Sequence, residues 1–370
     1  MDKEKKVLFI VGQWSRAGGL EIVTQDAVKA FIKAGYKAIV LVVGGNGDDV
    51  RDESLHVIHL APRNRILMSL WHRYFKYPIV GRRLDSLLSD DDRIVFGHTF
   101  LLKVLDYSRK AKLCRKWVWS HGGDVWNADA KWVIPYINRL ERLISVSQYT
   151  ADRAKELGVV VPISVIPNSI DTHRFVPTST PDRIRYDEIL ICSRIPVDFL
   201  YKGHGVLLKA LPIVERILNR PVSLRIVGSG AGLASLRALV KTEGLEGKVT
   251  VTGFVPDDKL IEAYQHCGVF CMPSTGEGFG LVYAETEACA RPVVVSTFGG
   301  APETVIDGET GLLADPNDIE ANARALAKIL GDRALADEMG RKGRLLAERA
   351  FSPETFERNV LRVIAEDEQS

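Results

Sequence analysis

Runs of apolar residues alternate with segments of helical spacing along the first half of the chain. The stretch KVLFIV at 6–11 is a continuous apolar run typical of a buried strand, and residues 20–35 then place apolar side chains at helical intervals. Further apolar runs lie at 37–43, 93–98, 116–120 and 142–147. This βαβ alternation predicts a parallel sheet covered by helices.

A second series begins after the irregular segment 165–177. Apolar runs resume at 188–195, 222–228, 248–254, 268–273 and 291–296. We therefore expect an α/β protein of two Rossmann-like, doubly wound domains that face a central cleft, with ligands at the carboxyl ends of the strands. The predicted domains are 1–170 and 171–351. A final helix at 352–370, capped by Ser352, is expected to pack back on the first domain.

Composition and charge narrow the class of protein. Of 370 residues, 46% are hydrophobic and 26% charged, as in globular proteins. The opening MDKEKKVLFIVG holds too short an apolar run for a signal peptide or spanning helix, and five scattered cysteines favour reduced thiols, so a cytoplasmic protein is expected. Residues 1–170 hold 26 Lys/Arg against 18 Asp/Glu, and the remainder 23 against 29. The two halves should meet different partners, with no nucleic acid among them.

The candidate chemistry is concentrated between residues 274 and 290. A loop follows the strand that ends at Pro273, and backbone N–H groups of Phe279, Gly280 and Leu281 at the start of the next helix predict an anion site. Glu277 and Glu285, eight apart, can accept hydrogen bonds from vicinal sugar hydroxyls. Alternatively, Glu277 complements the helix dipole and Glu285 is a solvated helix carboxylate.

The stretch from Glu277 through TEACARPVVVSTFGGAPETVIDGETGLL resembles the signature of the retaining glycosyltransferases of the GT-B fold, family four. Other segments resemble elements of that family in the same order: WSRAGGLE, HGGDVW, LISVSQYTADRA with VIPNSIDTHRF, and CSRIPVDFLYKGHGVLL. The chain departs from the pattern in three places. Arg194 and Lys202 are eight apart rather than five, and Ser193 and Ala290 replace glycines.

The resemblance implies roles for individual residues. Glu285 would hold the ribose of a nucleotide and Glu277 its sugar, while Arg194 and Lys202 would neutralise the diphosphate leaving group. His121 would lie by the anomeric carbon, although a structural histidine bonded to a loop carbonyl is the alternative. The remaining donor-binding candidates are Gly18, Gly19, Gly230 and Val255. For Gly18 and Gly19 an ordinary strand-to-helix turn is the alternative.

The implied reaction moves a hexose from UDP-hexose or GDP-mannose to a glycan or lipid-linked acceptor, in bacterial cell-surface polysaccharide or lipopolysaccharide synthesis. We expect no metal or other cofactor, because the acidic run Asp90–Asp92 precedes a strand instead of ending one and favours a solvated turn. A nicotinamide oxidoreductase is disfavoured, since no dinucleotide fingerprint follows the first strand. A nucleotide-sugar epimerase and a non-catalytic sugar-binding protein stay open.

Residues 63–83, RNRILMSLWHRYFKYPIVGRR, hold six Lys/Arg and no Asp/Glu. As a helix, this segment would place Ile66, Leu67, Leu70, Trp71, Tyr74 and Phe75 on one side. We expect it to touch an anionic membrane surface at the inner face of the cytoplasmic membrane or to meet the acceptor, through Arg73, Lys76, Arg82 and Arg83. The alternative is a helix packed on the domain core with a solvated basic face.

Overall fold

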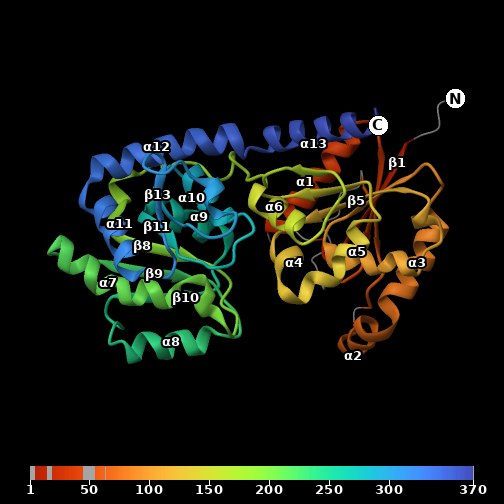
Figure 1. The fold of residues 1–370 in the computed structure, drawn as a ribbon. Helices are drawn as coiled ribbons and strands as arrows, with labels where there is room; N and C mark the ends of the chain where they lie inside the picture. The colour runs from red at the N-terminus through yellow and green to blue at the C-terminus, as the bar shows by residue number, and fades with distance from the viewer. Residues whose placement is uncertain (1–4, 15–18, 45–54, 63, 370) are drawn as a thin grey trace. The chain divides into compact units, whose positions relative to one another are not determined.

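The computed structural model of the chain describes residues 5–14, 19–44, 55–62 and 64–369 (Figure 1). It forms two compact units, one of Met1–Ser169 with Glu354–Ser370 and the other of Ile170–Pro353. Within the described ranges, no helix is both long and apolar enough to cross a membrane.

The first unit is built on a parallel sheet of seven strands in the order β3-β2-β1-β4-β5-β6-β7. The strands are β1 (Lys6–Val11), β2 (Lys37–Val42), β3 (His56–His59), β4 (Arg93–Phe96), β5 (Arg115–Ser120), β6 (Arg142–Ser145) and β7 (Ile163–Val165). The central strands are buried almost throughout, which matches their apolar sequences. The winding direction reverses between β1 and β4, so the switch point of the sheet lies between these two strands.

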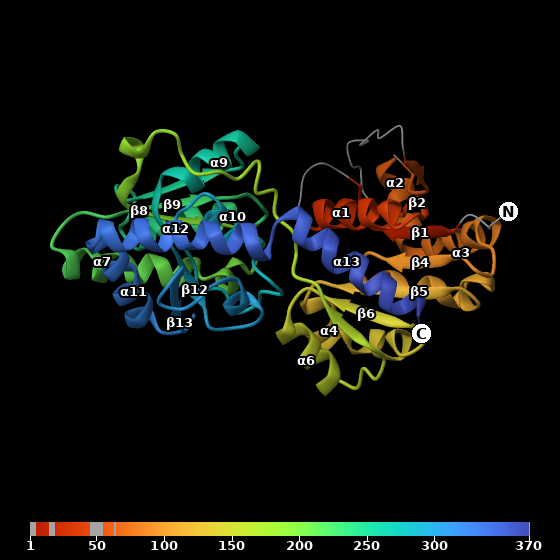
Figure 2. The ribbon, with the colours of Figure 1, turned by 90° about the horizontal axis from the view of Figure 1, so that it is seen from above.

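Helices cover both faces of this sheet. The α-helices are α1 (Gly19–Lys33), α2 (Arg65–Leu70), α3 (Lys76–Leu87), α4 (Gly123–Trp126), α5 (Ile134–Ile137), α6 (Gln148–Glu156) and α13 (Pro353–Glu368). The 3₁₀ segments are η2 (Thr99–Asp106), η3 (Lys110–Lys112) and η4 (Ala128–Val133), and η1 (Trp71–Phe75) is a π-helical turn. Helix α13 lies beside α1 over the sheet (Figure 2), where Lys33 pairs with Glu357 at 2.5 Å and Phe356 stacks on Trp119.

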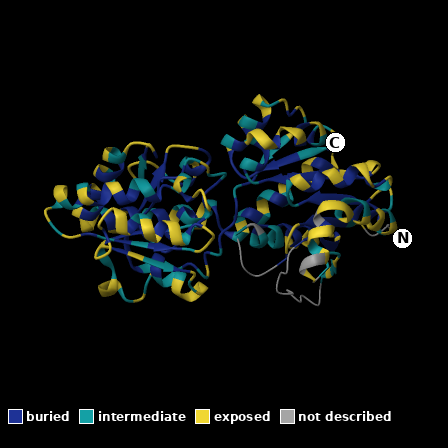
Figure 3. Ribbon diagram, turned by 90° about the horizontal axis from the view of Figure 1, so that it is seen from below, coloured by how far each residue is buried: buried dark blue, intermediate teal, exposed yellow. Residues whose placement is uncertain are grey.

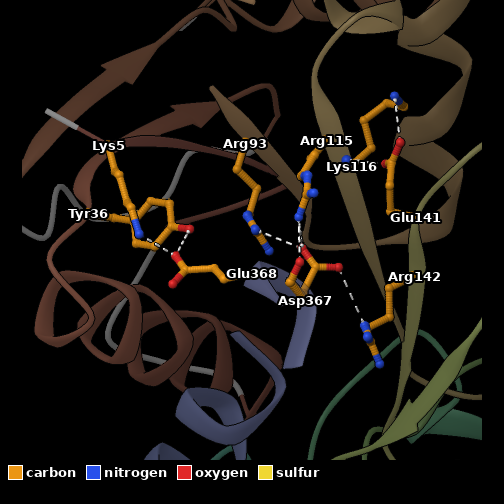
Figure 4. A network of polar contacts seen from close by, with 9 residues as sticks. All are labelled: Lys5, Tyr36, Arg93, Arg115, Lys116, Glu141, Arg142, Asp367 and Glu368. Atoms are coloured by element: carbon orange, nitrogen blue, oxygen red, sulfur yellow. Dashed lines mark hydrogen bonds and ion pairs between the residues drawn. The ribbon is translucent and has the colours of Figure 1, made fainter. Parts of the chain in front are cut away.

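The end of α13 is anchored by charge. Asp367 is only 3% exposed, and its carboxylate lies 2.7 Å from the guanidinium of Arg93 and 3.3 Å from that of Arg115 (Figure 4). The next residue, Glu368, accepts hydrogen bonds from Lys5 at 2.7 Å and Tyr36 at 2.8 Å. These contacts fix the end of α13 against β4 and β5 and against the residues that precede β1 and β2.

The second unit has a parallel sheet of six strands in the order β10-β9-β8-β11-β12-β13. The strands are β8 (Arg185–Cys192), β9 (Ser223–Val227), β10 (Val249–Gly253), β11 (Cys267–Met272), β12 (Val293–Ser296) and β13 (Gly311–Ala314). The α-helices are α7 (His204–Leu218), α8 (Leu233–Thr242), α9 (Asp257–His266), α10 (Leu281–Ala288), α11 (Ile319–Gly331) and α12 (Arg333–Ala350). The 3₁₀ segments are η5 (Pro181–Arg183), η6 (Phe199–Lys202) and η7 (Ala301–Thr304). The strands again form the buried centre of the unit (Figure 3). The predicted α/β class is confirmed.

The basic segment 64–83 is helical, but not as one regular amphipathic helix. The π turn η1 separates α2 from α3, and its extra residue per turn changes which side chains share a face. Trp71 was expected on the exposed apolar side, yet it is buried and donates to the carbonyl oxygen of Val43 at 2.9 Å. Of the predicted apolar side, Leu67, Leu70, Tyr74 and Phe75 are exposed, and the side chain of Ile66 lies outside the described part of the structure. Arg73, Arg82 and Arg83 are also exposed, whereas Lys76 is half-buried.

Candidate active site

The predicted glutamates lie at the switch point of the second sheet. Strands β8 and β11 are neighbours there, and the winding direction reverses between them. The loop after β11 carries Glu277, and the helix that follows it, α10, carries Glu285. Because ligands of open α/β sheets bind outside the carboxyl ends of the strands at this point, both carboxylates are placed for ligand binding.

Glu277 is paired with a second predicted site residue. Its Oε1 lies 2.5 Å from Lys202 Nζ, and both side chains are mostly buried. Lys202 ends the 3₁₀ turn η6, and Gly203 after it has a φ of +84°. A side chain at Gly203 would overlap the carbonyl oxygen of Pro273, so this glycine is required for Lys202 to approach the loop after β11.

Two glycines that sequence reasoning left without a role hold the backbone of Glu277. Gly300 N–H donates to the Glu277 carbonyl oxygen at 2.9 Å. Gly299 has a φ of +75°, and a Cβ there would overlap the same oxygen. The only sequence signal was their place in the family-like stretch STFGGAPE, which does not reveal what they contact.

Glu285 lies in a protein environment that disfavours its charge. Tyr264 donates to its Oε2 at 2.8 Å, and desolvation raises the pKa of Glu285 to about 7 despite that hydrogen bond. Arg174 favours the ionised form, and Asp257 opposes it. Glu285 is therefore not the solvated helix carboxylate of the alternative interpretation. Tyr264 was not identified from the sequence, because nothing local marks a tyrosine on α9 as a neighbour of α10.

The amino end of α10 is formed as predicted. Gly280 precedes the helix with a φ of +91°, and Leu281 is its first residue and half-buried. The side chain of Phe279 is only 3% exposed and packs edge-to-face on Phe351 at 5.4 Å between ring centroids. A ligand can therefore reach Phe279 only through its backbone. The sequence predicted this backbone contact.

The glycine loop after β9 supports the segment that carries Arg194. Gly228 and Gly230 have φ values of +141° and +151°, and side chains there would overlap the carbonyl oxygens of Ser193 and Ile195. Ile195 N–H also donates to the Ser229 carbonyl at 2.9 Å. Arg194 itself is exposed and makes no ion pair within the described ranges. The structure thus pairs Lys202 with Glu277 but does not bring Arg194 into that pair.

Val255 completes the donor-binding residues predicted in this unit. It follows β10 at the carboxyl edge of the sheet and is half-buried, beside Phe254, which is 77% exposed. Val255 therefore lies at the carboxyl ends of the parallel strands, as do the loops that carry the glutamates.

The first unit has a cavity of about 280 Å³ at its own switch point. Residues that follow β1 and β4 line it, together with side chains from α1, α3 and η2. Its lining is Val11, Gly12, Gln13, Glu21, Thr24, Lys76, Gly97, His98, Phe100 and Leu101. Lys76, predicted to contact a membrane surface or the acceptor, therefore lines a cavity and does not belong to the solvated basic face of the alternative interpretation. Burial lowers the pKa of Lys76, and no carboxylate pairs with it among the described residues.

His121 follows β5 beside this cavity. Its Nε2 bonds to the carbonyl oxygen of Gly97 at 2.9 Å, and its Nδ1 is buried with no partner in the described structure. Desolvation lowers the pKa of His121, so the ring is neutral at pH 7. His98, which the sequence analysis did not single out, lies 5.9 Å from it between ring centroids. The backbone N–H of His121 donates a hydrogen bond to Asp124 Oδ1 at 2.8 Å.

The other predicted residues of the first unit are less informative. Gly19 is the first residue of α1, whereas Gly18 lies outside the described residues. Asp92, in the acidic run before β4, accepts from Lys6 Nζ at 3.0 Å and from the Ser89 N–H at 2.7 Å. The segment is a turn, as expected, but Asp92 is only 4% exposed and ion-paired, so the expectation of a solvated turn is wrong for this residue.

Comparisons with known proteins match both units. The family model described as "Glycosyl transferases group 1" covers residues 189–346, and "Glycosyltransferase Family 4" covers residues 17–174. A GDP-mannose-dependent α-(1-6)-phosphatidylinositol monomannoside mannosyltransferase of Mycolicibacterium smegmatis is 33% identical over 72% of this chain and 75% of its own length. A D-inositol 3-phosphate glycosyltransferase of Corynebacterium urealyticum is 38% identical over 46% of this chain and 43% of its own length.

Solved structures agree over nearly the full chain. An Anabaena protein crystallised with UDP and glucose has a TM-score of 0.78 at 20% identity and covers 98% of this chain and 100% of its own. Sucrose-phosphate synthase of Thermosynechococcus elongatus has a TM-score of 0.76 at 22% identity, with 98% of each chain covered. At these identities the likeness concerns the fold.

Proposed function

Because the chain belongs to the group 1 glycosyltransferases of the family-four type, with the GT-B fold, we propose that it is a retaining, metal-independent hexosyltransferase. In this proposal it moves a hexose from a nucleotide sugar to a hydroxyl of a glycan or lipid-linked acceptor. The observation that carries the proposal is the arrangement of Glu277, Lys202 and Glu285 at the switch point of the second sheet.

The proposed donor contacts follow from the chemistry of these groups. Glu285 accepts hydrogen bonds from the ribose and Glu277 from the transferred sugar, since carboxylates bind vicinal hydroxyls well. Departure of a nucleoside diphosphate builds negative charge, which Lys202 and the amino end of α10 would stabilise, with Arg194 as a second cation. Lys202 pairs with Glu277 at 2.5 Å, and in this proposal the diphosphate of the donor competes with Glu277 for this ammonium.

The first test combines transfer with substitution. Purified protein with GDP-mannose or UDP-hexoses and an acceptor extract should release nucleoside diphosphate and form an α-linked product from an α-linked donor. Glu285→Ala and Lys202→Ala should each lower kcat/KM by about 30- to 1,000-fold, the value of one charge-assisted contact in a closed site. Near-normal turnover in either variant would refute the site. An epimerase would instead convert the donor without releasing the diphosphate, and a non-catalytic binder would do neither.

Independence from metal is tested separately. Activity should survive EDTA, because Lys202 and the helix terminus take the place of a cation and Asp92 is committed to Lys6. Loss of activity on chelation, restored by Mg²⁺ or Mn²⁺, would reverse this part of the proposal.

GDP-mannose is the donor we propose to test first, because the relative at 33% identity is named for it. For the acceptor, the cavity of the first unit offers the half-buried ammonium of Lys76, which has no carboxylate partner among the described residues. That favours an acceptor with an anionic group, such as a phosphorylated polyol or a lipid-linked phosphate, in the synthesis of cell-surface glycans. Lys76→Met should raise the KM for such an acceptor and leave the KM for the donor unchanged.

A membrane-bound acceptor agrees with the exposed side chains of α2, η1 and α3. Leu67, Leu70, Tyr74 and Phe75 are 42–56% exposed, and three arginines lie nearby in sequence. We propose that this surface binds the inner face of the cytoplasmic membrane, since each basic residue near an anionic leaflet contributes about 1 kcal/mol.

Sedimentation with vesicles tests the membrane proposal. Binding should require anionic lipid, weaken with salt, and fall when Arg73, Arg82 and Arg83 are replaced by serine. Lys209→Ser with Arg216→Ser on α7 removes exposed charge from the other unit and should leave binding unchanged. Binding that ignores lipid charge would favour a soluble acceptor.

A further inference from the structure

The hydroxyl of Tyr264 contacts Glu285 from the neighbouring helix. Tyr264 is fully buried on α9, and its hydroxyl donates to Glu285 Oε2 at 2.8 Å. Glu285 is only half-buried, and its Oε1 accepts no hydrogen bond from the parts of the chain that are described. We propose that Tyr264 is a positioning residue that holds one oxygen of Glu285 and leaves the other oxygen for the donor's ribose hydroxyls. This inference rests on the proposed function.

Tyr264 is itself held rigidly. Its ring packs edge-to-face on Phe270 of β11 at 5.9 Å and on Phe175 at 6.1 Å, both measured between ring centroids. An unsupported glutamate samples several rotamers, so it would have to lose side-chain entropy when a ligand binds. The bond from a fixed phenol removes much of that cost before the donor arrives.

The same hydrogen bond stabilises the ionised form of Glu285. Desolvation raises the pKa of Glu285 to about 7, and the Tyr264 hydroxyl opposes this rise. The charged neighbours are Arg174 and Asp257, which pair with each other at 2.6 Å and act in opposite directions. The facing thiols are those of Cys192 and Cys289, and burial raises the pKa of Cys192 to about 12 and that of Cys289 further, so both stay neutral.

Because a carboxylate accepts two hydroxyl hydrogen bonds and a neutral carboxyl does so poorly, donor binding should follow the ionisation of Glu285. Removing the Tyr264 hydroxyl should therefore make the donor bind well only at higher pH. A residue that merely filled the core would lower activity by the same factor at every pH.

The experiment measures the pH profile of kcat/KM for the donor in the parent protein and in Tyr264→Phe. The acidic limb should have its midpoint near pH 7 in the parent and about one to two pH units higher in the variant, the effect of losing a hydrogen bond to a charged group. At pH 7 the variant should lose activity mainly through KM, and it should recover toward the parent value under alkaline conditions.

Tyr283→Phe is the matched control. Tyr283 is also fully buried and lies on α10, but its hydroxyl donates to the Met272 carbonyl and not to Glu285. This variant should lose stability without moving the midpoint. An unchanged midpoint in Tyr264→Phe, or an equal shift in Tyr283→Phe, would overturn the inference.

A direct titration separates this inference from the proposed function. The carboxyl carbon of Glu285, labelled with ¹³C and assigned through Glu285→Gln, should titrate at higher pH in Tyr264→Phe without any donor present. Absence of transfer with every nucleotide sugar would refute the proposed function. An unshifted carboxyl titration would refute the role of Tyr264 alone.

Discussion

Asp367 anchors the C-terminal helix, and we predict that Asp367→Asn destabilises the first unit. The substitution keeps the size of the side chain and one oxygen but removes the negative charge beside the buried guanidinium of Arg93, 2.7 Å away. Breaking a buried ion pair from one side costs about 3–5 kcal/mol, because the remaining charge stays desolvated. We expect the low end, about 3 kcal/mol, since Arg93 also stacks on Trp117 at 4.6 Å and Arg115 is 48% exposed.

Tryptophan fluorescence during urea unfolding is the assay. All six tryptophans lie between Trp14 and Trp132, so the signal reports on the first unit alone. Trp117 lies directly under Arg93 and should respond to the loss of its pairing. A loss of about 3 kcal/mol with an unchanged m-value would agree with the ion-pair argument.

The control is Glu366→Gln, one residue earlier in the same helix. Glu366 is 47% exposed and contacts Arg362 at 3.2 Å, so its removal should cost less than about 1 kcal/mol. A parent-like stability in Asp367→Asn, or equal losses in both variants, would refute the argument. The double variant Asp367→Asn with Arg93→Met should recover part of the loss, because it no longer buries an unpaired charge.

Three further predictions concern the second unit. Ala290 has a φ of +56°, so Ala290→Gly should stabilise the protein by up to about 1 kcal/mol in calorimetry, whereas Ala238→Gly in the exposed middle of α8 should cost about 1 kcal/mol. Gly230→Ala should lower kcat/KM at least about tenfold by displacing Ile195 and the adjacent Arg194, while Ser229→Ala leaves it unchanged. The pKa of Glu285 is about 7 in the folded chain and ordinarily 4.5, so the stability that its protonated form contributes is complete below pH 4.5 and is lost as the pH rises through 7. Glu285→Gln does not titrate and should therefore lose less stability over this pH range. Parallel curves of unfolding free energy against pH for the parent and the variant would contradict this prediction.

Much of the fold was predictable, because its central strands are continuous apolar runs. The runs at 6–11 and 268–273 became β1 and β11, and the helix expected after Gly280 begins at Leu281. The short strands β3, β7 and β13 were missed. All three are edge strands with partly exposed side chains and have only three or four residues, so their sequences carry little apolar signal.

Only the part of the site that lies within one short stretch of sequence was predictable. Glu277 and Glu285 stand in one local motif, whereas the Tyr264 contact and the support of Glu277 by Gly299 join residues from separate elements. The side chains that share a face in residues 64–83 were also mispredicted, because a helical period of 3.6 assumes a uniform rotation per residue and the π turn at Trp71–Phe75 changes that rotation. Family resemblance supplied the roles that spacing alone left open.

The first unit joins the two ends of the sequence, and this affects how the protein is made on the ribosome. Residues up to Ser169 emerge first, but the unit is complete only when Glu354–Ser370 has been synthesised. At about 5–20 residues per second, that delay is roughly 10–40 s. During this time the aromatic surface around Trp119, which Phe356 later stacks on, and the guanidinium of Arg93 have no C-terminal helix to cover them. The nascent chain should therefore be a better chaperone substrate than the finished protein, and the second unit should fold before the first is closed.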